Sequence, residues 1–158
     1  ASGGLVGRGP RPGVERGYHL RFDGEEARLT RPVGWAEGGF YATPMAGHLR
    51  VAGTVELDRW DAPPTPARLD YVAAGAARMV GDLPAPSAAW VGARPSMPDA
   101  KPVIGALRPG GRVLAAYGHQ HLGLTLAGVT GRMVVDAVQG RAAEPGGEAH
   151  SPARFVRR

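Results

Sequence analysis

Apolar and polar residues alternate along two segments in the first half of the chain. Residues 17–22 and residues 49–56 carry an apolar side chain or glycine at every second position. A period of two predicts β-strands with one buried face. Two shorter pieces, residues 27–31 and 39–43, are also typical of strands. The positions expected on the buried faces are Tyr18, Leu20 and Phe22 in one strand and Leu49, Val51, Gly53 and Val55 in the other.

Turn-forming residues separate these segments. The turns are Asp23-Gly24, Glu37-Gly38-Gly39 and Ala46-Gly47. Short turns of this composition connect neighbouring antiparallel strands. The first half of the chain therefore predicts an antiparallel sheet with one face covered.

Helical spacing follows in two places. The first helix is predicted to begin after Thr65, a capping residue type, with Pro66 at its first position, and to end near Gly81. The second follows a short apolar strand at residues 112–117, and further short strands are expected around 89–93 and 102–107. The apolar stripes are Leu69, Val72, Ala73, Ala76, Met79 and Val80 in the first helix and Leu126, Val129, Met133 and Ala137 in the second.

Composition narrows the class of protein. With 158 residues and 43% hydrophobic content the chain can bury a core, and its 25 glycines and 15 prolines predict many turns. The absence of cysteine excludes disulfides and thiolate metal sites. No apolar stretch approaches the ~20 residues that cross a bilayer, and Ala1–Arg8 has no signal-peptide core.

The positive charge does not indicate nucleic-acid binding. The net charge is +5, but the arginines are scattered and often lie beside Glu or Asp. Lys101 is the only lysine, and no basic run is interleaved with aromatic residues. We therefore expect no nucleic-acid partner.

Two stretches carry candidate chemistry. Gly118–Thr125 lies where the strand at 112–117 leads into the second helix, and unpaired N–H groups with the helix dipole would stabilise an anionic or electron-rich group there. Arg94 ends a strand before a loop restrained by prolines. Its guanidinium has the geometry to bind a carboxylate with two hydrogen bonds. The alternative for Arg94, a structural ion pair with Asp99, stays open.

These stretches resemble the family of FAD-dependent D-amino-acid dehydrogenases and oxidases, which includes glycine, sarcosine and hydroxyproline-type oxidising enzymes. The resemblance depends on the order and spacing of several short blocks. They are Glu15-Arg16-Gly17-Tyr18-His19, Gly39-Phe40-Tyr41-Ala42-Thr43-Pro44-Met45, Leu49 to Glu56, Trp90-Val91-Gly92-Ala93-Arg94-Pro95, Pro98-Asp99, Pro102-Val103-Ile104-Gly105, Gly118-His119 with Leu122-Gly123-Leu124-Thr125, and Ser151-Pro152-Ala153-Arg154-Phe155.

The resemblance implies roles for both stretches. In that family the arginine matching Arg94 binds the substrate carboxylate, and the Gly118–Thr125 loop lies along the pyrimidine edge of the flavin. The implied reaction oxidises the C–N bond of a small D-amino or imino acid by hydride transfer from its α-carbon to flavin N5, as in amino-acid catabolism. Negative charge that develops on the reduced flavin would be stabilised by N–H groups and Thr125. The implied FAD contacts are Gly118, His119, Gln120, His121, Leu122, Gly123, Leu124 and Thr125, and no catalytic base is assigned.

The chain departs from the family at its start. The glycine fingerprint G-x-G-x-x-G is absent, and Gly3–Gly7 does not replace it because no long helical pattern follows. We therefore expect a C-terminal portion of such an enzyme that binds FAD poorly alone. The expected α+β organisation is a linker or truncated edge at 1–15, a substrate-binding domain with a mainly antiparallel sheet and one flanking helix at 16–107, a strand, loop and helix of an incomplete FAD-binding domain at 108–140, and a tail at 141–158.

A second function stays open, namely a non-catalytic remnant or subunit that completes a separate FAD-binding chain. The flavin colour of the purified chain separates the two readings, because substrate bleaches it only in a catalytic protein. We expect a cytoplasmic location and leave open peripheral contact with the inner membrane face. Substrate side chain, stereochemistry, electron acceptor and oligomeric state are not readable from the sequence.

The remaining candidates are tyrosine and histidine residues. Tyr18 and Tyr41 are predicted either to pack with a bonded hydroxyl or to line a substrate pocket. His121 is predicted to contact substrate or flavin, since a metal pair with His119 has no third ligand at a supporting spacing. His48 is expected in a turn, and no Ser-His-Asp or paired-carboxylate arrangement is recognisable.

Overall fold

The structure, a computed structural model, describes residues 11–108, 110–141 and 146–155. It divides the chain into two compact units. We call Glu15–Ala93 the sheet unit, and Ala1–Val14 together with Arg94–Arg158 the terminal unit. The chain leaves one unit and enters the other inside strands β1 (Gly13–Asp23) and β5 (Ala88–Ser96).

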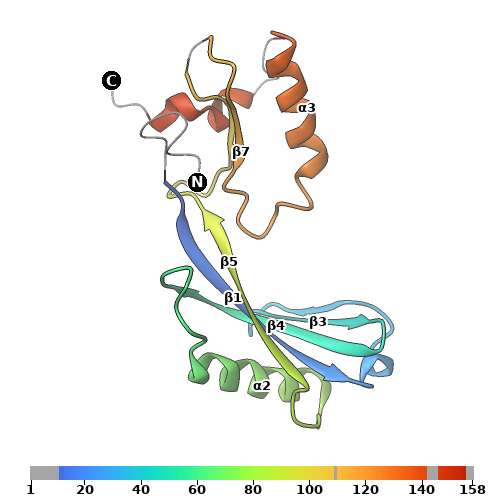
Figure 1. The fold of residues 1–158 in the computed structure, drawn as a ribbon. Helices are drawn as coiled ribbons and strands as arrows, with labels where there is room; N and C mark the ends of the chain where they lie inside the picture. Colours follow the sequence, from blue (N-terminus) through green and yellow to red (C-terminus); the bar gives the residue numbers. More distant parts are fainter. Residues whose placement is uncertain (1–10, 109, 142–145, 156–158) are drawn as a thin grey trace. The chain divides into compact units, whose positions relative to one another are not determined.

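A sheet of five strands in the order β2-β3-β4-β1-β5 dominates the first part of the fold (Figure 1). The bounds are β2 (Val33–Trp35), β3 (Phe40–Met45) and β4 (His48–Leu57). Strands β2, β3, β4 and β1 pair antiparallel, which confirms the predicted sheet. The turn between β3 and β4 has Gly47 at φ +75°, a conformation that glycine adopts without strain.

Helix α2 (Pro66–Val80) covers one face of this sheet, as Figure 1 shows. Its first and last residues match the prediction, and Val72 and Ala76 are fully buried against Tyr18, Leu20 and Phe22. A glycine in mid-helix has a packing reason. A Cβ at Gly75 would lie 2.3 Å from the Phe40 ring, so the helix approaches β3 closely only without a side chain there.

One residue of β4 interrupts the predicted alternation. Tyr18 pairs with Gly53 and Gly17 pairs with Val55, so Thr54 is an extra residue at φ +59°. Such a β-bulge exchanges the faces of the residues that follow it. Val55 is therefore 44% exposed, and its expected place on the buried face is wrong. Glu56 takes the α2 side of the sheet instead.

Glu56 and its neighbours form a polar cluster at the start of α2. Tyr18 Oη donates a hydrogen bond to Glu56, Thr65 Oγ1 donates to Glu56 Oε1 at 2.7 Å, and Arg16 Nη1 lies 3.2 Å from Glu56 Oε2. The sequence suggested that the Thr65 side chain caps the helix. Its hydroxyl binds Glu56 instead and makes no capping hydrogen bond. Arg16 also donates to the Ala62 carbonyl, which explains how a 2% exposed guanidinium is satisfied.

The terminal unit contains a small sheet and a helix. Strands β6 (Val103–Ala106) and β7 (Leu114–Tyr117) pair antiparallel, and α3 (Ala127–Val138) follows them. These elements confirm the strands and helix predicted in this part of the sequence. Their core is formed by Met97, Val103 and Ala115.

Short 3₁₀ helices occur where the sequence predicted a strand and a tail. Residues predicted as a strand at 27–31 begin inside η1 (Glu26–Arg28). Part of the expected tail folds as η2 (Gly147–His150) and η3 (Pro152–Phe155), with Phe155 packed against the terminal core. The segment 141–158 is therefore not a free tail over its described residues.

The Gly3–Gly7 segment and most of the expected linker at 1–15 lie outside the described residues. Within the described ranges, no helix combines the length and the apolar character needed to cross a membrane.

Candidate functional site

Arg94 lies near the end of β5 and is partly buried. In the described part of the chain its guanidinium has no hydrogen bond or ion pair. The proposed partner Asp99 is occupied by Arg154, whose Nε lies 2.7 Å from Asp99 Oδ2 and whose Nη2 lies 3.2 Å from Oδ1. The structural ion pair between Arg94 and Asp99 is therefore wrong, and the Arg94 charge is available to a ligand.

The pKa of the Asp99 carboxyl is lowered, mainly by its hydrogen bonds from Arg154. Arg154 also donates to the carbonyl of Lys101 at 2.7 Å, so one guanidinium fixes the turn after β5 and the last 3₁₀ helix together. This contact explains why the polar C-terminal segment is folded.

The structure brings the two predicted stretches together. The N–H of Gln120 donates to the carbonyl of Pro95 at 3.2 Å. Ser96, the next residue, forms an isolated antiparallel bridge with His119. The segment that carries Arg94 is thus hydrogen-bonded to the Gly118–Thr125 loop.

Left-handed backbone shapes the loop after β7. Gly118 has φ +81°, and a Cβ there would lie 2.6 Å from Met97 Cγ, so only glycine fits. Gln120 has φ +53°, which costs energy in a residue with a side chain. The hydrogen bond to Pro95 and the bridge to Ser96 hold this conformation.

His119 is turned toward α3. Its Nε2 lies 2.9 Å from Thr130 Oγ1, on the buried position of the helix. Burial lowers the pKa of His119, and the positive charge of His150 lowers it further. His119 is therefore neutral at pH 7 and serves to position the loop against α3.

The loop presents several backbone donors without protein partners. Within the described residues, the N–H groups of His121, Gly123, Leu124 and Thr125 donate no hydrogen bond inside the fold, and these residues are exposed. The helix starts at Ala127, later than the sequence suggested, and the Ala127 N–H already donates to the Leu124 carbonyl. The free donors therefore belong to the loop rather than to the first turn of α3.

The two predicted tyrosines lie on opposite faces of the sheet. Tyr18 is 1% exposed on the α2 side, and its hydroxyl donates to Glu56 and accepts from the Thr65 N–H at 3.1 Å. These contacts agree with the alternative in which Tyr18 packs in the core with its hydroxyl hydrogen-bonded. Tyr41 is 67% exposed on the other face, where its ring lies beside Gly34. His121 is exposed in the loop.

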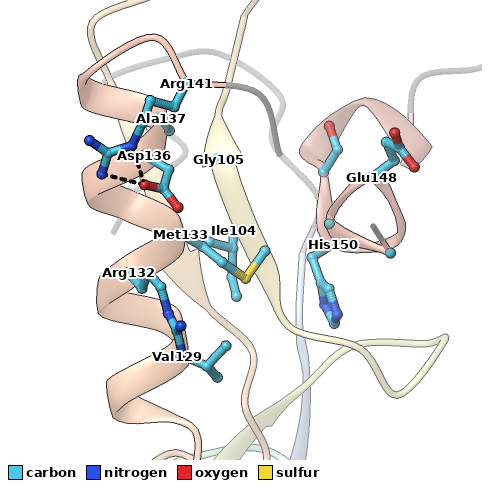
Figure 2. Close-up of a pocket in the computed structure, with 13 residues that line it drawn as sticks. Ile104, Gly105, Val129, Arg132, Met133, Asp136, Ala137, Arg141, Glu148 and His150 are labelled. Atoms are coloured by element: carbon cyan, nitrogen blue, oxygen red, sulfur yellow. Dashed lines mark hydrogen bonds and ion pairs between the residues drawn. The ribbon is translucent and has the colours of Figure 1, made fainter. Parts of the chain in front are cut away.

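A cavity of about 490 Å³ lies elsewhere in the terminal unit (Figure 2). It is bordered by α3, β6 and η2, and contains the ion pair between Arg141 and Asp136 opposite Glu148 and His150. None of the predicted site residues lines it. The sequence could not indicate this cavity, because half of its wall comes from the segment expected to be a tail.

Among the described residues, no group of three or more His, Asp or Glu side chains is arranged to hold a metal ion. His119 is turned to Thr130, and His121 has no partner in the described fold.

Comparison with known proteins identifies the family of this chain. The family model described as FAD dependent oxidoreductase matches residues 1–137. A D-amino-acid oxidase of Bradyrhizobium diazoefficiens is 33% identical over 148 residues, covering 90% of this chain and 35% of that protein. A glycine oxidase of Pseudomonas aeruginosa is 33% identical over 106 residues, covering 65% of this chain and 29% of that protein.

Solved structures share the fold. Glycine oxidase from Geobacillus kaustophilus superposes with a TM-score of 0.79 at 24% identity, covering 94% of this chain and 41% of that one. L-proline dehydrogenase from P. horikoshii superposes with a TM-score of 0.77 at 21% identity, covering 96% of this chain and 42% of that one. The chain thus spans between 29% and 42% of the length of these proteins. The α+β fold and the match over residues 1–137 together show that the chain belongs to the family of FAD dependent oxidoreductases, whose cofactor is FAD.

Proposed function

We propose that this chain forms part of an enzyme that oxidises the C–N bond of a small D-amino or imino acid and passes the electrons to FAD. The observation that carries the proposal is the unpaired guanidinium of Arg94 on a segment hydrogen-bonded to a loop with free N–H groups. The D-amino-acid oxidase of Bradyrhizobium diazoefficiens supports the substrate class by similarity.

The residues present fit an electron-rich ring edge. Backbone donors at His121, Gly123, Leu124 and Thr125 are free to bind such an edge, and the buried Oγ of Ser96 has no partner in the described fold. We assign Gly118–Thr125 to contact with FAD, with His119 positioning the loop through Thr130. When bound, FAD supplies the two-electron acceptor, and the donors of this loop favour negative charge on it.

Arg94 binds and orients the substrate carboxylate in this proposal. Its planar fork makes two parallel hydrogen bonds to a carboxylate, which fixes the direction of the α-carbon as well as the affinity. His121 and Tyr41, both exposed, are assigned to further substrate contacts. Tyr18 remains in the predicted set, but its hydroxyl is engaged by Glu56 and Thr65.

The predicted domain boundary at residue 107 differs from the boundary between the two compact units, because Arg94 and strand β6 belong to the terminal unit. We assign residues 16–107 to substrate binding and residues 108–140 to the C-terminal part of the FAD-binding domain. The cavity beside α3 exposes Val129 and Met133, and we assign it to packing with the rest of that domain. In the second reading, this rest is a separate chain and the present chain is its subunit.

The assignment of Arg94 to the substrate carboxylate is tested by Arg94→Lys in the flavin-loaded enzyme. Lysine keeps the charge and loses the fork, so we expect the KM for a D-amino acid to rise about 10- to 100-fold. Arg59→Lys, at an exposed position paired with Asp61, is the matched control and should leave KM unchanged. A KM for Arg94→Lys within twofold of wild type would mean that Arg94 is structural.

Flavin absorbance separates the two readings. A yellow protein whose visible flavin absorbance is bleached by substrate in the absence of oxygen supports catalysis. A colourless chain that gains flavin only with a second chain supports the subunit reading.

A further inference from the structure

Arg154 lies in η3, near the C-terminal end of the described chain, and its side chain is 15% exposed. Each of the five N–H groups of its guanidinium has an acceptor. The acceptors are both carboxylate oxygens of Asp99 and the carbonyls of Lys101, His150 and Ser151. One fully bonded cation therefore joins the C-terminal segment to the turn after β5.

The turn bonded by Arg154 contains a strained residue. Ala100 has φ +57°, a left-handed conformation that costs energy in a residue with a side chain. The Ala100 N–H donates to the Met97 carbonyl at 2.9 Å, and the Lys101 N–H donates to Asp99 Oδ1 at 3.3 Å. The Asp99 carboxylate thus binds the backbone of the turn and the guanidinium together. Arg154 therefore fixes the side chain that supports the strained turn.

The same turn borders the loop that we assign to FAD. Met97 lies against Gly118, the first residue of the loop, where a Cβ would be 2.6 Å from Met97 Cγ. The two residues before Met97 pair with the loop, through the Gln120 hydrogen bond to the Pro95 carbonyl and the bridge formed by Ser96. A displacement of the turn would therefore move the loop, because one short stretch of chain holds both.

Arg154 is also close to the strand that enters the loop. Strand β7 ends at Tyr117, the residue before Gly118. Burial raises the pKa of the Tyr117 hydroxyl, and the nearby positive charge of Arg154 opposes this rise. Phe155 and Tyr117 pack against the same core, which includes Met97. The C-terminal segment thus shares one core with the turn and the strand that hold the loop.

We infer that Arg154 is a positioning residue for the flavin site: by holding the turn after β5, it fixes the backbone donors of Gly118–Thr125 and the place of Arg94 beside them. This inference rests on the function proposed above and gives the C-terminal segment a role in it. Arg154 acts through Asp99 and touches neither FAD nor substrate. Without its guanidinium the loop keeps its sequence but samples more conformations, and donors held less firmly bind an electron-rich edge more weakly.

Amide hydrogen exchange of the loop tests this inference without flavin or turnover. The reporters are the N–H groups of Gln120, Leu122 and Leu126, which are hydrogen-bonded in the fold. Mass spectrometry of loop peptides compares wild type with Arg154→Gln in the absence of FAD. We expect these amides to exchange about 10-fold faster in the variant, although the substitution lies outside the loop.

A matched control comes from the same unit. Arg141→Gln removes a partly exposed guanidinium that is paired with Asp136 near the end of α3. The loop amides of this variant should exchange at the wild-type rate. All exchange is measured well below the melting temperature of each variant, so that global unfolding does not contribute.

Flavin binding provides the second readout. In Arg154→Gln we expect the Kd for FAD to rise about 10-fold, because the donors of the loop are less well held. Arg154→Lys keeps the charge and loses the fork, so it should recover only part of the affinity. Asp99→Asn should weaken FAD binding as Arg154→Gln does. The double variant should be no weaker than either single one, since both substitutions break the same contact.

The inference requires both faster exchange of the loop amides and weaker FAD binding. If Arg154→Gln accelerates exchange only in the C-terminal segment, or leaves the Kd for FAD unchanged, Arg154 is structural and the inference is overturned. If Arg154→Gln does not fold, the same two measurements on Arg154→Lys and Asp99→Asn decide. Both changes in an enzyme whose flavin no amino acid reduces would support the positioning role and overturn the proposed function.

Discussion

Replacing Tyr18 by phenylalanine removes one hydroxyl from the polar cluster at the start of α2. The side chain is 1% exposed, so water does not replace the lost group. The hydroxyl donates to Glu56 and accepts from the Thr65 N–H at 3.1 Å. Losing a hydrogen bond to a charged acceptor costs about 1.5–3 kcal/mol, and an unpaired buried N–H adds to it. Glu56 keeps its bonds from Thr65 and Arg16, so we expect Tyr18→Phe to lower the free energy of unfolding by about 2–3 kcal/mol.

The effect of this substitution should depend on pH. The pKa of the Glu56 carboxyl is lowered by the hydrogen bond from Tyr18 first, then by that from Thr65 and by the charges of Arg16 and Arg68. A depressed pKa in the folded state means stability that is present above the unfolded value of 4.5 and is lost as the pH falls through the folded value. The penalty of Tyr18→Phe should therefore be full at pH 7 and smaller once Glu56 is protonated.

Urea unfolding of wild type and variant at neutral pH and at about pH 3, below the ordinary carboxyl pKa, measures both quantities. Tyr41→Phe is the matched control, because Tyr41 is 67% exposed and has no hydroxyl partner in the described chain. We expect it to change stability by less than about 0.5 kcal/mol. A Tyr18→Phe penalty below that value at pH 7, or one that does not shrink in acid, would refute the assignment of this hydroxyl to the core cluster.

Two further substitutions test the loop and the C-terminal segment. Gly118→Ala should destabilise the chain by about 2–4 kcal/mol, since it adds a strained φ and a contact of 2.6 Å with Met97. Gly24→Ala, at φ +74° with nothing within 4 Å, should cost only about 1 kcal/mol in the same urea titration, and equal penalties would contradict the packing argument. Arg154→Gln should expose Phe155 to chymotrypsin several-fold faster than wild type, because its bonds to Asp99 and Lys101 are lost. Unchanged cleavage would show that those bonds do not hold the segment.

Local patterns were sufficient for most of the elements. The alternation in β1, the turn at Ala46-Gly47 and the stripe of α2 each involve neighbours in sequence, so they predict structure without knowledge of the rest. The same holds for the position of the Gly118–Thr125 loop between β7 and α3. The sequence indicates Arg94 as a candidate carboxylate-binding residue, but it does not show that Arg94 makes no ion pair with Asp99. The partner that competes for Asp99 is Arg154, separated from it by 55 residues.

The bulge at Thr54 shows how one residue can redirect a site. Sequence alternation alone puts Val55 inside and Glu56 outside, and nothing in the local pattern indicates the positive φ of Thr54. The bulge becomes understandable only from the partners that Glu56 meets, namely Tyr18, Arg16 and Thr65. An interior pairing of this kind depends on residues from three elements, so a reading along the chain does not find it.

The same reasoning applies to the loop that we assign to FAD. Its shape depends on contacts inside the terminal unit, which are the Gln120 bond to Pro95, the His119 contact with Thr130 and the fit of Gly118 against Met97. These contacts fix the backbone of the loop, and donors that are held in a fixed arrangement are the kind that stabilise developing charge effectively. The apolar side chain of Leu124, in the same loop, is 93% exposed. On the proposed function, the chain supplies a preformed set of donors, and the rest of a FAD-binding domain would bury the apolar surface beside them.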